Sequence, residues 1–385
     1  MFSHLLHYWL LLVFLQILLS RNMVAAGNVS AIIVFGDSTV DTGNNNDVPS
    51  IIKSNFPPYG RDYYGGIPTG RFSNGRVIID FISEAFGLPP SVPSYLGNND
   101  TIEQLATGVC FASGGTGLDD LTAELLLAIP IGQQLEYFKE YKEKLKLSKG
   151  ESVANEIIAQ ALYIFSIGNN DVGVNYFLLP VRRAQFTPTE YVTYLIGIAD
   201  AAVRSAYEAG ARKIQLIGIL PVGCVPAMRT VNLEAPGQCD EAFNQLAMSY
   251  NSELQELASK LNGDLPGVLI VYADQLYSIV SNIITNPLDY GFQNVAQGCC
   301  GTGLIELSFL CALDQPLLCQ DDDKYVWFDS VHPSERTHKI VANEILKTVL
   351  QVEKGFARRA ESEALSNIGC DLQKTEWLSI FSIQI

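Results

Sequence analysis

Five short stretches of the chain are almost wholly apolar, and glycine or polar residues bound each of them. They begin at residues 31, 107, 161, 213 and 267 and run AIIVFGD, TGVCFAS, ALYIFSIG, KIQLIGI and GVLIVYAD. Short continuous apolar runs are typical of parallel strands that are buried on both faces. Between them the apolar residues take a helical spacing, which is clearest over residues 189–211, 239–262 and 332–351.

This alternation of strands and helices predicts an α/β fold, a doubly wound parallel sheet of about five strands. In such a sheet the binding site lies beyond the C-terminal ends of the strands. Three predicted strand ends carry small or hydrogen-bonding residues, namely Gly36-Asp37-Ser38, residues 113–117 (SGGTG) and residues 168–171 (GNND). The pattern therefore predicts one site built from these three ends.

Composition limits the classes of protein to consider. The chain has 385 residues, 48% of them hydrophobic and 17% charged, and no linker rich in proline, glycine or serine divides it. One large domain is therefore expected. The formal net charge of −16 argues against nucleic acid and anionic membrane surfaces as partners.

The N-terminal segment has a different character. An apolar run over residues 5–20 is followed by Arg21 and by the small residues Val24-Ala25-Ala26. We expect residues 1–26 to be a secretory signal peptide, with an uncleaved anchor as the alternative. No later segment is long and apolar enough to span a bilayer, so no stable membrane insertion is predicted.

Secretion would place the eight cysteines in an oxidising compartment. Cys224 with Cys239, and pairs among the cysteines from Cys299 to Cys319, are plausible disulfides whose pairing the sequence leaves open. No paired CxxC motifs indicate zinc. Two glycosylation sequons, at Asn28 and Asn99, fit secretion, although such tripeptides often stay unused.

Histidine is scarce, and two of the four histidines fall within the predicted signal peptide. Of the others, His338 lies inside a predicted helix, where a surface or half-buried position is expected. His332 follows Asp329 by three residues, a spacing that lets the carboxylate accept a hydrogen bond from Nδ1 and leaves Nε2 to take a proton from a hydroxyl. An ordinary turn or cap is the alternative role for Asp329.

Ser38 is either a nucleophile or a helix N-cap. A serine hydroxyl attacks poorly without a base, and His332 with Asp329 would supply one. The attack creates an oxyanion that needs preorganised donors. The candidates are the N–H of Ser38, an N–H of the turn at residues 114–115, and the side-chain amide of Asn170.

The glycines at residues 114–117 also have other interpretations, a tight turn or a phosphate-binding loop. They lack the GxGxxG spacing and the later acid of a dinucleotide site, and no lysine stands where a P-loop needs one. Asp37 is expected to cap the turn before Ser38. Asp41 and Asn44 to Asn46 either shape the mouth of the site or form a solvated loop.

Eight motifs occur in a familiar order: FGDSTVDTGNNN, PPYGRDY, GRFSNGRVIIDFI, CFASGGTG, SIGNNDV, LPVGCVP, CCGTG and FDSVHPSE. Over about residues 29–352 the chain resembles the plant GDSL esterase/lipases of the SGNH hydrolase superfamily. The resemblance implies a three-layer, flavodoxin-like hydrolase domain over residues 27–355, with no metal or cofactor. It also implies a triad of Ser38, Asp329 and His332, and an oxyanion hole formed by Ser38, Gly115 and Asn170.

The chain departs from the family pattern in several places. Thr39 stands where leucine is usual and is expected to alter local packing only. Cys110 stands where asparagine is usual, so it either loosens the turn at Gly115 or is a free buried thiol. Residues 356–385 form an atypical C-terminal extension. The acidic run over residues 321–323 is expected to be a solvated loop rather than a calcium site.

These features predict a secreted serine hydrolase of the apoplast or cell wall that cleaves carboxylic esters through an acyl-enzyme. Its partner would be a small-molecule or polymeric ester, and short acyl esters, long-chain lipids, cutin-like polyesters and acetylated wall polysaccharides all fit. An acyltransferase that uses the same triad with an alcohol acceptor is the alternative. A wall or carbohydrate-binding protein without turnover is the third possibility.

Overall fold

The computed structural model describes residues 29–97, 100–273, 276–313 and 317–350. The predicted signal peptide, the C-terminal extension, both sequon asparagines and Cys370 lie outside these residues. The elements described below belong to one compact unit, residues 29–346.

Five parallel strands form the central sheet, and all five match the apolar runs of the sequence. They are β1 (Ile32–Gly36), β2 (Gly108–Cys110), β3 (Leu162–Ser166), β4 (Lys213–Ile217) and β5 (Leu269–Ala273). Their order is β2-β1-β3-β4-β5, which is the flavodoxin-like order. Every residue of β1 and β3 is buried, which explains why these strands show no polar alternation.

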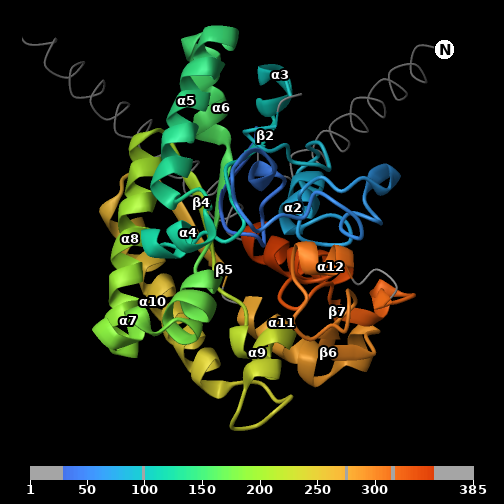
Figure 1. Ribbon diagram of the computed structural model, residues 1–385. Helices are drawn as coiled ribbons and strands as arrows, with labels where there is room; N and C mark the ends of the chain where they lie inside the picture. The colour runs from blue at the N-terminus through green and yellow to red at the C-terminus, as the bar shows by residue number, and fades with distance from the viewer. Residues whose placement is uncertain (1–28, 98–99, 274–275, 314–316, 351–385) are drawn as a thin grey trace, which may run out of the picture. The chain divides into compact units, whose positions relative to one another are not determined.

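Helices cover both faces of the sheet. From β1 to β2 the chain moves toward one edge of the sheet, and this connection contains α2 (Ile78–Ala85). From β2 through β3 and β4 to β5 it moves toward the other edge, and these connections contain α5 (Ile131–Lys149), α6 (Glu151–Gln160), α8 (Pro188–Glu208) and α10 (Glu241–Asp264). Because crossovers are right-handed, α2 packs on one face and the others on the opposite face. Figure 1 shows α5, α8 and α10 on one side of the strands and α2 on the other. This arrangement is the expected three-layer α/β/α fold.

Shorter helices fill the connections. They are α3 (Ile102–Leu105), α4 (Asp120–Leu126), α7 (Pro180–Gln185), α9 (Pro226–Val231), α11 (Leu276–Thr285), α12 (Phe309–Leu313), the π-helix η3 (Asp171–Leu178) and the 3₁₀ turns η1 (Asn44–Asp47), η2 (Tyr64–Gly66), η4 (Val222–Cys224), η5 (Pro287–Tyr290) and η7 (Asp322–Lys324). A further helix begins at residue 335. Within the described ranges, none of the helices combines the length and the apolar character needed to cross a bilayer.

The predicted helices are confirmed with small shifts at their ends. Residues 189–211 correspond to α8, which begins after Thr187. The Thr187 hydroxyl accepts a hydrogen bond from the Glu190 N–H, and the Glu190 carboxylate accepts one from the Thr187 N–H. This capping box fixes the N-terminus of the helix. Gly210 lies one residue beyond the C-cap at Ala209, in a left-handed conformation with φ 120°.

A second, two-stranded parallel sheet was not predicted. It pairs β6 (Asn294–Gly298) with β7 (Tyr325–Trp327). The NVAQG sequence of β6 lacks an apolar run, so periodicity gives no strand signal there. Beside it lie the disulfides Cys299–Cys319 and Cys300–Cys311, and a third disulfide joins Cys224 to Cys239 as expected.

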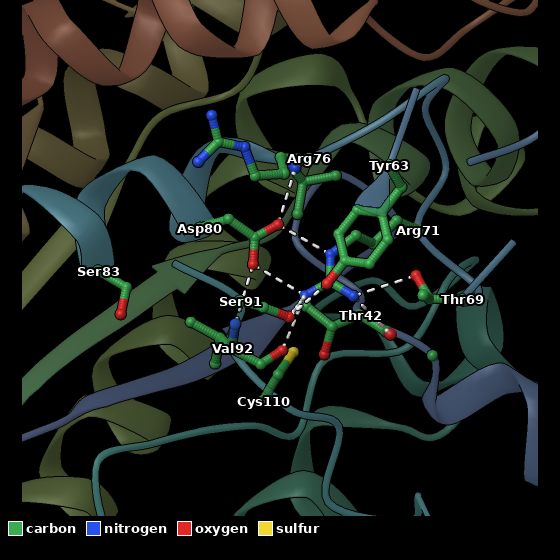
Figure 2. Close-up of polar contacts among 12 residues, drawn as sticks. Thr42, Tyr63, Thr69, Arg71, Arg76, Asp80, Ser83, Ser91, Val92 and Cys110 are labelled. Carbon is green, nitrogen blue, oxygen red and sulfur yellow. Dashed lines mark hydrogen bonds and ion pairs between the residues drawn. The ribbon is translucent and has the colours of Figure 1, made fainter. Parts of the chain in front are cut away.

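A buried ion pair fixes the connection between β1 and β2. The guanidinium of Arg71 meets the carboxylate of Asp80 on α2 with both N–O distances at 2.8 Å. Arg71 also donates to the carbonyl of Val92, and Asp80 accepts from the Val92 N–H (Figure 2). Because both buried charges are paired with each other, the loop that carries Phe72 has one defined path.

Candidate active site

Strand β1 ends at a glycine because β3 approaches it closely. Gly36 has a φ of 151°, and a Cβ atom there would lie 2.1 Å from the Ser166 carbonyl oxygen. The buried amide of Gln134 on α5 binds both the N–H and the carbonyl of Gly36, at 2.9 and 3.0 Å. These contacts fix the direction in which the chain leaves the sheet, and they place Ser38 just beyond its C-terminal edge.

Asp37 caps the turn before Ser38, as predicted. One carboxylate oxygen accepts from the Thr39 N–H at 3.0 Å and from its hydroxyl at 2.7 Å, and the other accepts from the Asn169 amide at 3.1 Å. Burial raises the pKa of Asp37, and the hydrogen bonds from Thr39 act against this rise. Thr39 therefore does more than alter packing, because its hydroxyl is part of the cap.

The glycine turn after β2 is held by residues from the Ser38 loop. The Gly114 N–H donates to Asp41 at 3.0 Å, and the amide of Asn45 donates to the Gly114 carbonyl at 2.8 Å. Gly115 has a φ of 92°, a left-handed conformation that favours glycine. Since the Gly114 N–H is already engaged, the geometry favours Gly115 over Gly114 as an oxyanion donor.

The polar residues after Ser38 are buried, so the alternative of a solvated loop is wrong for Asp41, Asn44 and Asn45. The amide of Asn44 donates to the carbonyls of Cys110 and Ala112, at 2.9 and 2.8 Å. These three side chains tie the loop to the end of β2. The sequence signal for this role was their position, a few residues after Ser38 at the end of β1.

Cys110 is a free buried thiol, one of its two predicted roles. Its Sγ donates to the Val40 carbonyl at 3.2 Å. Burial raises the pKa of this thiol to about 12, so it stays protonated and unreactive. The side-chain anchors of the glycine turn come from Asp41 and Asn45 rather than from position 110.

The third strand end contributes Asn170 and Asp171. The Asn170 amide donates one hydrogen to the Thr116 carbonyl at 3.0 Å, and an amide NH₂ carries a second hydrogen. Asp171, which the sequence analysis did not single out, accepts from the Leu118 N–H at 2.7 Å and from the Thr122 hydroxyl at 2.6 Å. Burial raises the pKa of Asp171 to about 7. Asp171 thereby fastens the glycine loop to the start of η3.

Asp329 and His332 form a buried hydrogen-bonded pair. Asp329 Oδ2 lies 2.7 Å from His332 Nδ1, and Oδ1 accepts the backbone N–H groups of Val331 and His332 at 2.9 and 2.7 Å. The three-residue spacing allows this contact because one turn of chain folds back on the carboxylate. The imidazole packs on the ring of Phe72, with 4.8 Å between the ring centroids.

His338 is buried, contrary to the expected surface or half-buried position. It is 4% exposed, and it lines a small cavity of about 30 Å³ with apolar neighbours that include Pro333 and Val341. Burial lowers the pKa of His338 to about 3, because the charged imidazolium loses its hydration. His338 is therefore neutral throughout the range in which an esterase would work.

We expect this histidine to make stability depend on pH. The unfolded chain takes up a proton near the ordinary value of 6.5, whereas folded His338 does so only near 3. Stability is therefore present above the unfolded pKa and falls as pH drops below it, by about 2 kcal/mol at pH 5. Chemical unfolding at pH 7 and pH 5 measures the loss. If the free energy of unfolding of a His338→Gln variant depended on pH as strongly as that of the unaltered protein, His338 would not be the cause.

Ser38, Gly115, Asn170 and His332 line one pocket of about 150 Å³. Asp329 is fully buried and hydrogen-bonds the imidazole of His332. The structure thus brings the predicted triad and oxyanion residues together, from the ends of β1, β2 and β3 and from the loop after β7. The other walls are mainly apolar: Ile52, Leu126, Val174, Leu220, Val222, Val225, Met228, Leu307 and Val331.

Within the described ranges, no group of three or more histidine, cysteine or acidic side chains is placed to hold a metal ion. The acidic run at residues 321–323 is not simply a solvated loop. Asp322 is buried and accepts from Arg61 Nε at 2.7 Å, while Asp321 and Asp323 are exposed. Its central acid is therefore part of a partly buried ion pair with Arg61.

Comparison with known proteins agrees with this geometry. The sequence model of the GDSL-like lipase/acylhydrolase family matches residues 32–345. The chain belongs to this family. A GDSL esterase/lipase of Arabidopsis thaliana is 47% identical over 86% of this chain and 94% of its own length. A second one from the same plant is 50% identical over 82% of this chain and 90% of its own length.

A solved structure of a catalytic mutant of Axe2, an acetylxylan esterase from Geobacillus stearothermophilus, covers 84% of this GDSL chain and 95% of its own. Its TM-score is 0.36 and its identity 13%, values too low to support an argument. The GDSL relatives cover most of the chain at high identity. The protein is accordingly a carboxylic ester hydrolase of the GDSL type.

Proposed function

We propose that this GDSL hydrolase cleaves its ester through an acyl-enzyme on Ser38. His332 Nε2 takes the proton of the Ser38 hydroxyl as Oγ attacks the ester carbonyl, and returns it to the leaving alcohol. Water then enters by the same route and releases the acid. The observation that carries the proposal is the buried Asp329–His332 pair at 2.7 Å, with His332 lining the same pocket as Ser38.

The oxyanion of each tetrahedral intermediate would lie among three donors. These are the N–H groups of Ser38 and Gly115 and the second amide hydrogen of Asn170. The anchoring of their loops by Asp41, Asn45 and Asp171 supports this assignment. Donors that are held in place before the reaction stabilise the developing charge without a cost of reorganisation.

The pocket favours an ester with a short apolar acyl group. Its volume of about 150 Å³ is below the 300–1,000 Å³ or so typical of sites for drug-sized ligands. Its apolar wall offers no partner for the hydroxyl groups of a sugar. We therefore place the acyl chain against Val222, Val225 and Met228, and the alcohol portion toward the open side.

We also propose that the enzyme is secreted. The apolar segment before Ala26 has the pattern of a signal peptide. The three disulfides are typical of an oxidising compartment. Expression of the full chain with a C-terminal tag, followed by N-terminal sequencing of the protein in the medium, tests this part.

The acyl-enzyme is tested by covalent capture. The protein is incubated with a fluorophosphonate, which modifies activated serines, and is then digested and analysed by mass spectrometry. The expected label lies on the peptide that contains Ser38, and labelling should stop p-nitrophenyl butyrate hydrolysis in parallel. Hydrolysis that continues in fully labelled protein, or a label elsewhere, would contradict the proposal.

Met228 is expected to limit the acyl chain length. It is 5% exposed on α9, and a Cβ atom added at Gly173 would lie 3.6 Å from its methyl carbon, so the Met228 methyl packs beside Gly173 in the lining of the pocket. Met228→Ala should raise the octanoate-to-butyrate ratio of kcat/KM by roughly tenfold, because the space for added methylenes grows. The exposed Met248 on α10 provides the matched control, Met248→Ala. Equal ratios in both variants would contradict this pocket assignment.

A further inference from the structure

A tyrosine from the segment between β1 and α2 reaches the carboxylate of the proposed triad. Tyr59 is 1% exposed, and its hydroxyl lies 2.7 Å from Asp329 Oδ2. This is the same oxygen that faces His332 Nδ1 at 2.7 Å. An ionised carboxylate only accepts hydrogen bonds, so the phenol is the donor. Asp329 Oδ2 is thus shared between the imidazole and the phenol.

The phenol itself is held from its other side. The backbone N–H of Ser308 donates to the Tyr59 hydroxyl oxygen at 2.9 Å. Burial and the neighbouring Asp329 raise the pKa of Tyr59 well above its usual value of 10, so it keeps its proton at every working pH. A phenol that accepts from a backbone amide and donates to a carboxylate has one defined orientation.

The surroundings of the ring allow it little movement. Phe56, Phe72 and Phe328 meet it edge-on, with centroid distances of 5.9, 6.2 and 5.4 Å. The cysteines of two disulfides, Cys299–Cys319 and Cys300–Cys311, belong to the same buried cluster. Cys300–Cys311 closes the segment that contains Ser308, so this crosslink restrains the backbone amide that holds the phenol.

We propose that Tyr59 is a positioning residue of the ester hydrolase, which orients the Asp329 carboxylate and sets how strongly that carboxylate stabilises the protonated imidazole of His332. A donor on Oδ2 draws negative charge away from the bond to Nδ1. The imidazolium is then held less tightly and releases its proton more readily. The effect on rate rests on the function proposed above, whereas the effect on the imidazole does not.

Among the described residues, two other titratable groups interact with His332. Asp37 at the end of β1 interacts with it electrostatically, as does His338 from the last helix. His338 is uncharged above about pH 3, and Asp37 does not contact Tyr59 in the described hydrogen-bond network. The loss of the Tyr59 hydroxyl therefore reaches His332 through Asp329, whereas a change in packing would reach it through Phe72, which contacts both rings.

Tyr59→Phe keeps the ring and removes the donor. The titration midpoint of the His332 imidazole, followed by NMR and assigned with His332→Ala, should move up by about 0.5 pH unit, and the acid limb of the kcat/KM profile should move with it. We expect kcat to fall roughly tenfold with little change in KM, because Tyr59 does not line the pocket. Tyr141→Phe is the control, since it removes a buried hydroxyl that donates to the Leu105 carbonyl.

Site-specific 3-fluorotyrosine at position 59 gives the opposite test and preserves the packing. A more acidic phenol is a stronger donor, so the midpoint should move down. Opposite shifts in the two proteins support the proposal, and they cannot arise from a role in packing alone. Unchanged midpoints in the folded proteins would overturn it. Should Tyr59→Phe not fold, the fluorotyrosine protein decides alone. If the unaltered protein did not hydrolyse esters, the proposed function would be wrong. The Tyr59 proposal could still be judged, because the NMR midpoints are measured without substrate.

Discussion

Replacing Ser38 with alanine is expected to lower ester hydrolysis by at least a factor of about 1,000, because the remaining groups cannot form an acyl-enzyme. The donors and the binding pocket stay in place, so the residual rate should still exceed that in water. Ser38 is 7% exposed at the wall of the pocket, and alanine fits there without strain. The thermal midpoint should therefore remain close to that of the unaltered protein.

The measurement compares kcat/KM for p-nitrophenyl butyrate and thermal unfolding in three proteins. The third is Ser249→Ala, in which an exposed helical serine of α10 loses a hydroxyl that binds only the Gln245 carbonyl. It should keep full activity. A Ser38→Ala protein that retained a tenth of the activity would show that another group is the nucleophile.

The second large effect is expected at His332. His332→Ala removes the proposed base and should lower kcat/KM nearly as much as Ser38→Ala does. The two losses should not add in the double variant, because a nucleophile and its base act as one unit. His338→Gln should keep most of the activity, since His338 does not line the pocket that holds Ser38 and His332 and is uncharged at neutral pH.

The comparison of the two histidines also shows what sequence patterns can distinguish. Activity in His332→Ala together with its loss in His338→Gln would exchange the two assignments.

The roles of the two residues were separated in the sequence by one local feature, the acid three residues before His332. The burial of His338 was missed, although Val341, Ala342 and Ile345 stand three, four and seven residues further on and place position 338 on the apolar face of its helix.

Local patterns also explain which elements of the fold were predicted. The runs that became β1 to β5 are apolar because these strands are covered by helices, and their ends were visible as glycine and polar residues. The pair β6 and β7 was missed because its strands are short and one is polar. The order of the strands came from the family resemblance, since periodicity says nothing about neighbours in a sheet.

By itself, the sequence determined the central strands, the three strand ends that meet at the site, and the Asp329-His332 pair, whose members lie only three residues apart. The tertiary structure alone decided the contacts that hold these groups in place. Gln134 binds Gly36 across 98 positions, Asp41 binds Gly114 across 73, and Tyr59 binds Asp329 across 270. The physical reason is that a hydrogen bond between distant segments depends on how the whole chain packs, and it leaves no periodicity in either segment.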